Sequence, residues 1–184
     1  MDRSQLVSHI PGLRRYARAL TGNAWAADDL VQDTLERACA KWRLWIVGSD
    51  LRAWLFTLMH NLYASGVRRA VRQQQSAPTE AWDDAVHTVA APDTATDMQL
   101  DLQRCLLQLP EEQRCVLLLV TLEDMAYVDV ARITGAPIGT VMSRLSRART
   151  RLQALLDAPA SQAPSNNRTG TGPTAAVVRL HTPR

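Results

Sequence analysis

The chain has 184 residues, with 21 Lys and Arg side chains against 18 Asp and Glu, and a formal net charge of +3. This length accommodates one ordinary domain or two small ones, and the 46% apolar and 21% charged residues are typical of a folded globular protein. The composition excludes a disordered or collagen-like chain, and a net charge this small does not by itself indicate a nucleic-acid partner.

The charges are grouped along the chain. Residues 1–72 carry a net charge of +5, residues 73–103 carry six acids and no base, and residues 104–156 and 157–184 carry +2 each. This order predicts two parts that can bind a polyanion, joined by an acidic connector. On charge alone, a solvated run of acids between two unrelated helical pieces explains the pattern equally well.

The residue types that form metal sites and disulfides are scattered. Cys39, Cys105 and Cys115 form no CxxC pair and fall in apolar helical patterns, so we expect buried, reduced thiols. The four histidines are not spaced as zinc ligands, and we expect no metal and no other cofactor. No stretch approaches the ~18 apolar residues of a membrane span, and the polar N-terminus is unlike a signal peptide, which predicts a cytoplasmic protein without membrane insertion.

Helical periodicity dominates the chain, and strand patterns are nearly absent. We expect a short helix over residues 13–20 and a longer one that Asn23 caps and that ends near Trp42. After a break at residues 47–49, Ser49 or Asp50 is expected to cap a second long helix. Three arginines lie near the end of that helix, namely Arg68, Arg69 and Arg72.

The predicted fold class is all-α, with two small helical domains. An N-terminal helical bundle is expected over residues 1–72 and a helix-turn-helix domain over residues 98–156. Residues 73–97 have little periodicity, which predicts a flexible acidic linker between the two. The Ala/Pro/Ser/Thr/Gly-rich tail, residues 157–184, is expected to be disordered.

Residues 126–151 have the pattern of a helix-turn-helix. We expect a short helix over 127–134, ended by Gly135 because glycine adopts positive φ without strain, and Pro137 suits the start of the next helix. One face of that next helix is apolar, and the opposite face carries Thr140, Arg144, Arg147 and Arg151. Such an arginine-bearing face can lie in the DNA major groove and bind guanine. The alternative is a surface helix with solvated arginines, and the turn residues favour DNA binding.

These motif residues resemble a known family. Residues 109–119 (LPEEQRCVLLL) and 135–148 (GAPIGTVMSRLSRA) look like the fourth conserved region of bacterial RNA polymerase sigma factors of the extracytoplasmic-function (ECF) group. In that family this helix-turn-helix reads the minus-thirty-five promoter element and docks on the polymerase flap. The recognition residues that the resemblance implies are Thr140, Met142, Ser143, Arg144, Ser146 and Arg147. Met142 departs from the family, which commonly has Lys or Arg at that position.

The first helical unit resembles the second conserved region of the same family. Residues 28–35 (DDLVQDTL) are similar to the helix that binds the clamp coiled coil of core polymerase, which implies Asp29, Gln32, Asp33 and Glu36 as contacts. A helix face of acids and amides suits a basic protein partner better than DNA. Taken alone, the segment is equally consistent with acids that the helix dipole favours on a solvated helix.

Residues 51–61 (LRAWLFTLMHN) resemble the segment that binds and melts the minus-ten element. Melting requires an unstacked base to be captured by stacking or by hydrogen bonds to its edge. Trp45 offers a stacking face, and Asn61 can form hydrogen bonds to a base edge. The phosphate contacts expected are Arg52, Arg68, Arg69 and Arg72. The family's usual Asp four residues after the Asn is Ser65 here.

The resemblance covers about two thirds of the chain and implies a sigma factor. Such a protein binds core RNA polymerase, directs it to a two-element promoter and promotes DNA melting, and the family implies an anti-sigma protein as a further partner. We find no catalytic set of residues, so we do not expect an enzyme. Two alternatives stay open: a helix-turn-helix regulator that acts without polymerase, and a sigma-like decoy that binds an anti-sigma protein.

Overall fold

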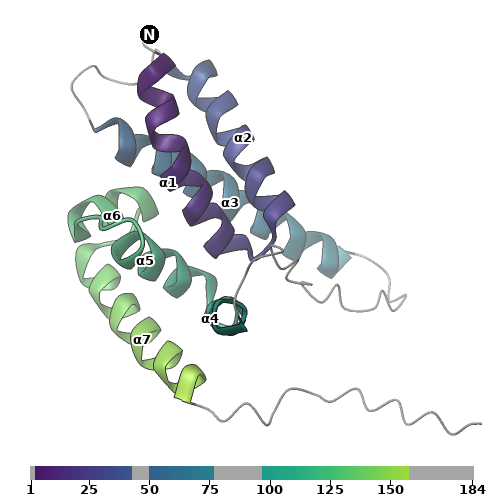
Figure 1. Cartoon of the computed structure of the whole chain (residues 1–184), viewed down its shortest axis with the longest axis vertical. Coiled ribbons are helices and arrows are strands. Elements are labelled where there is room, and N and C mark those ends of the chain that lie inside the picture. Colours follow the sequence, from purple (N-terminus) through teal and green to yellow (C-terminus); the bar gives the residue numbers. More distant parts are fainter. Residues whose placement is uncertain (1–2, 43–49, 77–96, 158–184) are drawn as a thin grey trace, which may run out of the picture.

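A computed structural model describes residues 3–42, 50–76 and 97–157, which form seven helices and no strand (Figure 1). The helices of the N-terminal half are α1 (Arg3–Thr21), α2 (Ala24–Ala40) and α3 (Leu51–Ser76). Those of the C-terminal half are α4 (Asp97–Leu107), α5 (Glu111–Thr121), α6 (Tyr127–Thr134) and α7 (Ile138–Asp157). The all-α prediction is confirmed. Trp45, most of the expected linker and nearly all of the expected tail lie outside the described residues.

The starts of α2 and α3 are fixed by side-chain caps. The Asn23 Oδ1 atom accepts hydrogen bonds from the backbone N–H groups of Trp25 and Ala26, at 2.9 and 3.1 Å. Asp50 Oδ1 accepts in the same way from the backbone N–H groups of Arg52 and Ala53, at 2.9 and 3.2 Å. These bonds satisfy N–H groups that have no partner inside the helix, so both helices begin where the capping signals predicted.

Helix α1 is longer than the sequence indicated. It begins at Arg3 and continues through Pro11, whereas proline inside a helix normally ends or kinks it. Leu6, before the proline, is buried with only 6% of its surface exposed, and Leu13, after it, is completely buried. Burial on both sides of Pro11 stabilises the extra turns despite the lost backbone hydrogen bond.

The N-terminal half packs around aromatic and aliphatic side chains. Tyr16 of α1 and Phe56 of α3 are both fully buried and meet edge to face, with ring centroids 5.4 Å apart. Trp54 packs against this core with its ring 6.2 Å from that of Trp42.

The helix-turn-helix has the predicted boundaries. Gly135 ends α6 with φ of 65°, a conformation that favours glycine, and α7 begins directly after Pro137. The inward-facing residues of α7 are Val141, Leu145 and Ala148, all buried. The sequence therefore predicted both the turn and the apolar face correctly.

The cysteines differ from one another in their surroundings. Cys115 is buried, and desolvation raises the pKa of its thiol to about 12, so it is not nucleophilic near neutral pH. Cys39 is exposed on α2 and Cys105 is only partly buried on α4, so the prediction of buried thiols is confirmed for Cys115 and wrong for Cys39. Its helix presents that side to solvent because the buried side is taken by Ala27, Val31, Thr34 and Ala38.

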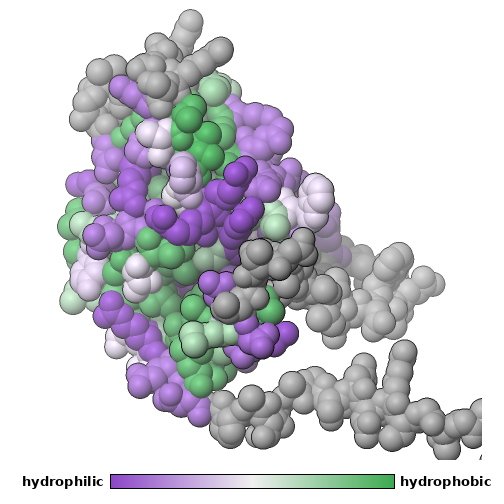
Figure 2. All heavy atoms as spheres, viewed as in Figure 1, coloured by the Kyte–Doolittle hydropathy of each residue, from purple (hydrophilic) through white to green (hydrophobic). Residues whose placement is uncertain are grey.

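The two halves lie against each other. Helices α1 and α3 contact α4, α5 and α6, as the central part of Figure 1 shows. Hydrophobic surface is visible over the C-terminal half in Figure 2. An apolar groove of about 560 Å³ lies between α4, α5 and α7. Among the described helices, none is both long enough and apolar enough to cross a membrane.

Candidate functional site

The exposed face of α2 carries the four residues expected to bind polymerase. Asp29, Gln32, Asp33 and Glu36 all point to solvent, and Gln32 Nε2 donates a 3.0 Å hydrogen bond to Glu36 Oε1. Asp28 differs from them because its carboxylate pairs with Arg14, with Nε and Oδ1 2.9 Å apart. The carboxylates of Asp29, Asp33 and Glu36, together with the Gln32 amide, therefore form one exposed, negatively charged face of α2.

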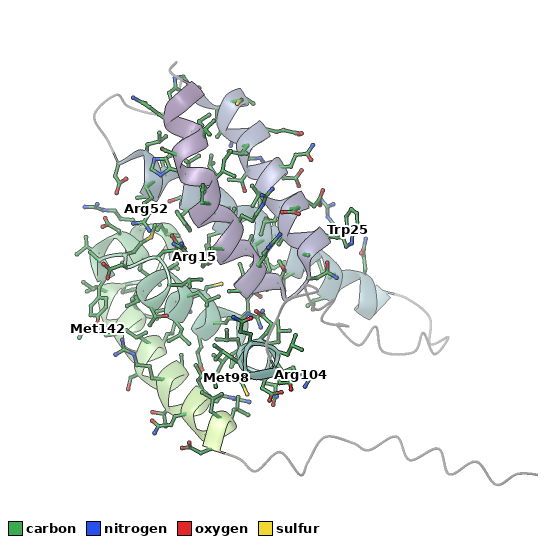
Figure 3. All side chains as sticks on the ribbon, viewed as in Figure 1. Arg15, Trp25, Arg52, Met98, Arg104 and Met142 are labelled. Atoms are coloured by element: carbon green, nitrogen blue, oxygen red, sulfur yellow. The ribbon has the colours of Figure 1, made fainter. Side chains whose placement is uncertain are left out.

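A residue that the sequence analysis did not single out extends this surface. Trp25 lies in the first turn of α2, and 82% of its surface is exposed (Figure 3). It precedes Asp29 by four residues and Gln32 by seven, the spacing that places side chains on one helix face. Tryptophan is enriched among the residues that contribute most to protein–protein binding. The spacing of Trp25 from Asp29 and Gln32 could be seen in the sequence, but the exposure of the Trp25 side chain could not.

Helix α3 carries an exposed face of amide and arginine side chains. Asn61, Arg68 and Arg72 are separated by seven and four residues, so they lie on one side of the helix, and all are exposed. Arg69 is exposed next to Arg68. Ser65, where the family usually has Asp, accepts a 3.1 Å hydrogen bond from Arg68 Nη2. The structure thus brings together four of the residues expected at the minus-ten element.

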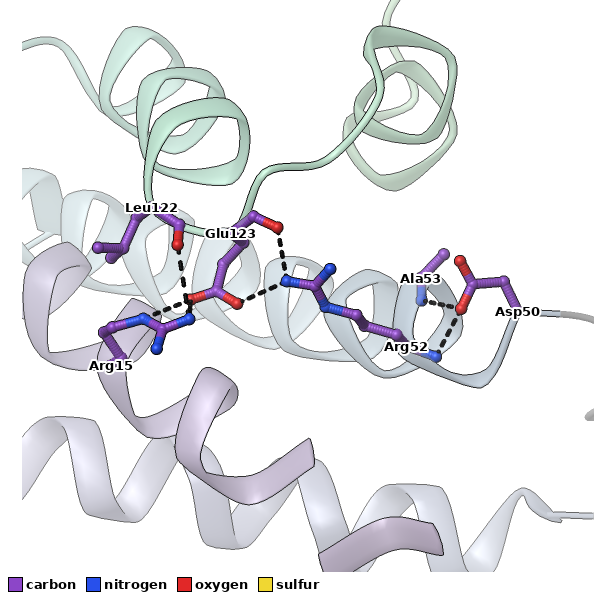
Figure 4. A network of polar contacts seen from close by, with 6 residues as sticks. All are labelled: Arg15, Asp50, Arg52, Ala53, Leu122 and Glu123. Atoms are coloured by element: carbon purple, nitrogen blue, oxygen red, sulfur yellow. Dashed lines mark hydrogen bonds and ion pairs between the residues drawn. The ribbon is translucent and has the colours of Figure 1, made fainter. Parts of the chain in front are cut away.

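Arg52 is separated from that group. It precedes Asn61 by nine residues, which is about half a helical turn out of phase and places it on the opposite side of α3. There its Nη2 atom donates to both the carboxylate and the backbone carbonyl of Glu123, with the carboxylate oxygen 2.9 Å away (Figure 4). Arg52 is therefore part of the contact between the two halves.

Helix α7, which carries the residues expected to recognise DNA, presents a mixed face. Met142, Ser143, Ser146 and Arg147 are exposed, while Thr140 and Arg144 are partly covered. The guanidinium of Arg144 forms an ion pair with Glu112 of α5. Met142 is 54% exposed and points away from the body of the protein (Figure 3). All six expected residues lie in the first half of α7, opposite or beside its buried stripe.

His60 lies where these surfaces approach each other. Burial lowers the pKa of its imidazole below the usual 6.5, and the nearby charges of Arg68 and Arg144 lower it further. His60 and Arg68 belong to α3, whereas Arg144 belongs to α7. The imidazole is therefore neutral at pH 7. The arginine-bearing faces of α3 and α7 lie close together around it.

The described residues contain no cluster of His, Cys, Asp and Glu that could hold a metal ion. What they present is a set of three exposed helix faces: one acidic, one with an amide and arginines, and one on a helix-turn-helix. These faces suit binding to a basic protein surface and to nucleic acid.

Comparison with known proteins gives a consistent picture. The family model for the sigma2 domain of PhyR matches residues 6–60, and the model for sigma-70 region 4 matches residues 99–152. The ECF RNA polymerase sigma factor EcfG of Rhodopseudomonas palustris is 39% identical over 155 residues, which cover 84% of each chain. SigM, an ECF RNA polymerase sigma factor of Mycobacterium tuberculosis, is 32% identical over 148 residues, which cover 80% of this chain and 73% of SigM.

A solved structure agrees with this relationship. The sigma factor RpoE of Bartonella quintana, solved in complex with the anti-sigma factor NepR, superposes with a TM-score of 0.70 at 39% identity. The match covers 85% of this chain and 96% of RpoE. Because the relatives match along most of both chains, and because the two matched regions are those that the motifs implied, the chain belongs to the ECF group of RNA polymerase sigma factors.

Proposed function

We propose that this sigma factor binds core RNA polymerase, directs it to a two-element promoter and promotes melting of the DNA. The observation that carries the proposal is the presence of three chemically distinct exposed faces on α2, α3 and α7 of one chain. Sigma factors are transcription factors rather than enzymes, and the protein acts by binding. Its site of action is the cytoplasm, where polymerase and DNA are found.

Core polymerase binds the acidic face of α2. Asp29, Gln32, Asp33 and Glu36 supply hydrogen-bond acceptors and negative charge for a basic surface, such as that of the clamp coiled coil. We add Trp25 to this set, because a large exposed aromatic ring beside the acids provides apolar area that the acids lack.

Promoter DNA at the minus-ten element binds the exposed face of α3. Asn61 is placed to read a base edge, while Arg68 and Arg69 hold phosphates beside it. Arg72 follows on the same face and extends the positive surface. Trp45 stays in the proposal as the stacking residue, although it lies outside the described residues. Arg52 is left out of this set, because its guanidinium pairs with Glu123 on the other side of the helix.

Promoter DNA at the minus-thirty-five element binds the exposed face of α7. Ser143, Arg144, Ser146 and Arg147 provide polar contacts to bases and phosphates from the start of the helix, where Thr140 also lies. Met142 has no charge to offer a phosphate, and its exposed thioether instead suits apolar contact with a thymine methyl group. A Met142→Arg variant is expected to relax this preference and steepen the salt dependence of binding.

The residue ranges 1–72 and 98–156 are the two domains that act on polymerase and promoter, and residues 73–97 and 157–184 are the linker and the tail. An anti-sigma protein is a further partner, since RpoE of Bartonella quintana was solved in complex with NepR. The polymerase flap binds the second domain, as the resemblance implies.

Permanganate footprinting of a cognate promoter tests the proposal. With core polymerase, the protein is expected to make thymines near minus ten reactive, and Asn61→Ala is expected to weaken that reactivity while core binding persists. Binding to DNA without core polymerase and without melting would favour the polymerase-independent regulator. Binding only to an anti-sigma protein would favour the decoy.

A further inference from the structure

Glu123 is a buried acid at the contact between the two halves. It lies in the turn between α5 and α6, and 1% of its side chain is exposed. An isolated carboxylate in such a place is strongly unfavourable unless cations and hydrogen-bond donors surround it. The C-terminal half supplies the acid, and the N-terminal half supplies its partners.

Two arginines from different helices bind this carboxylate (Figure 4). Arg15 of α1 approaches Oε1 with its Nη2 atom at 2.8 Å and its Nε atom at 3.0 Å. Arg52 of α3 approaches Oε2 at 2.9 Å. The partners are 108 and 71 residues away in the sequence, so these bonds exist only while the halves are together.

The surrounding backbone is shaped for this contact. Asp124, which follows the buried acid, has φ of 48°, a left-handed conformation that residues other than glycine adopt at a cost in free energy. On the other side, a Cβ atom added at Gly12 of α1 would lie 3.0 Å from Glu123 Oε2, so glycine leaves the space that the carboxylate fills. The turn is therefore held against α1 at close range.

This closed arrangement is too compact for a two-element promoter. Elements at minus ten and minus thirty-five are about 25 base pairs apart, or about 85 Å along B-form DNA. Helix α7 has 20 residues and is only about 30 Å long. In the closed form the first helix of the helix-turn-helix packs directly on α3. The faces of α3 and α7 must separate before both can bind such a promoter.

The covalent chain permits this separation. Twenty residues connect Ser76 to Asp97. When fully extended, a segment of that length spans about 70 Å. Opening therefore requires only that the noncovalent contacts between the halves be lost.

We propose that Glu123, bound by Arg15 and Arg52, is an intramolecular latch that holds the sigma factor in a closed form, and that the chain must release it to bind core polymerase and a promoter together. This proposal rests on the proposed function in one respect: the two halves need to separate only if the protein binds both promoter elements at once. The exposed recognition face of α7 is accessible in both forms, so the latch controls engagement of two sites at once rather than binding to one.

Distance measurements on the full-length protein test whether the latch exists. Spin labels on the exposed native Cys39 and on a Gln153→Cys substitution in α7 report the distance between the halves. A Cys105→Ser substitution removes the partly exposed third thiol, and the buried Cys115 does not react with the label. Glu123→Gln removes the charge with little change of shape, and Arg15→Gln removes one partner. Both are expected to convert a single short distance into a broad, longer distribution. Asp101→Asn, which removes the exposed pair with Arg104, is the matched control and should not.

Binding measurements test whether the latch is inhibitory. Core polymerase is proposed to bind α2 through its clamp and the second domain through its flap, so full binding uses both domains at once and requires the open form. Apparent affinity then scales with the population of that form, and a tenfold larger open fraction lowers the apparent Kd for core polymerase by up to about tenfold. Glu123→Gln and Arg15→Gln should both produce this gain, while binding to a short minus-thirty-five duplex stays unchanged. Unchanged distances in both variants would overturn the latch, and an opening that leaves core affinity unchanged or weaker would overturn its inhibitory role. Because the distances need no polymerase or DNA, their outcome is independent of the proposed function.

Discussion

The Nη2 atom of Arg114 in α5 donates a 2.7 Å hydrogen bond to the hydroxyl of Tyr63 in α3. The same guanidinium donates from Nη1 to the backbone carbonyl of Leu107 at 3.1 Å, at the end of α4. Arg114 is 8% exposed, so this buried cation depends on these acceptors. One side chain thereby joins the C-terminal end of α4 to α3, the helix proposed to bind the minus-ten element.

Loss of the tyrosine hydroxyl should destabilise the protein. We expect Tyr63→Phe to lower the free energy of unfolding by about 1.5 kcal/mol, because a hydrogen bond to a charged group is lost and Arg114 keeps its charge. Urea denaturation monitored by circular dichroism measures the change. Tyr127→Phe, at a tyrosine that is 38% exposed, is the control and should stay within about 0.5 kcal/mol of wild type. Equal effects of the two substitutions would contradict this assignment.

Two arginines of α7 should contribute unequally to DNA binding. Arg147 lies on the exposed face proposed to contact DNA, whereas Arg149 lines the apolar groove with Leu152. We expect Arg147→Ala to weaken binding to the cognate minus-thirty-five duplex by about 1–3 kcal/mol. Arg149→Ala should have a much smaller effect. Fluorescence anisotropy at fixed salt measures both, and a larger loss for Arg149→Ala would show that a different face binds.

Trp25 should contribute strongly to polymerase binding. Its removal in Trp25→Ala is expected to weaken core affinity by about 2 kcal/mol, roughly thirtyfold, as for other aromatic anchors. Stability should be unaffected, since the side chain is 82% exposed. Met98→Ala removes another large apolar side chain, 81% exposed and outside α2, and should leave core affinity as it is. The idea fails if both substitutions reduce affinity equally.

His60 should make stability sensitive to acid. Burial and the charges of Arg68 and Arg144 lower the pKa of the folded-state imidazole below 6.5, so the unfolded chain takes up this proton first. Stability contributed by the neutral imidazole is therefore present above pH 6.5 and is lost as the pH falls below that value, until the folded state is also protonated. Urea unfolding at pH 7, 6 and 5 measures the slope.

The substitution His60→Gln should remove this component of the pH dependence. Arg68→Gln should shift its acid limit towards higher pH, because one of the two cations that disfavour protonation is gone. A His60→Gln protein with the full wild-type slope would show that other groups cause the acid sensitivity.

Local signals predicted the local structure well. Asn23 and Asp50 cap the helices that they were expected to cap, and Gly135 ends α6 as expected. Each of these features depends on a few neighbouring residues and on hydrogen bonds to the nearby backbone. The exposed face of α2 was also predictable, because helical periodicity separates it from the buried Val31.

The contact between the halves could not be predicted in the same way. A glutamate in a turn normally lies in water, so nothing near Glu123 indicated that it would be buried. Arg52 was expected to contact phosphate because residues 51–61 resemble the segment that binds the minus-ten element. Its partner, Glu123, comes instead from the other half of the chain. Burial of this kind depends on long-range packing, which periodicity and turn signals do not encode.

Run-off transcription on fragmented genomic DNA of the host tests the central claim most directly. Core polymerase is incubated with the DNA in the presence or absence of the full-length protein, and the 5′ ends of the transcripts are sequenced. We predict a limited set of new start sites that appear only with the protein and share two upstream elements at a fixed spacing, and that disappear with Asn61→Ala combined with Arg147→Ala. Start sites that are identical with and without the protein, while the protein still binds core polymerase and DNA, would contradict the account.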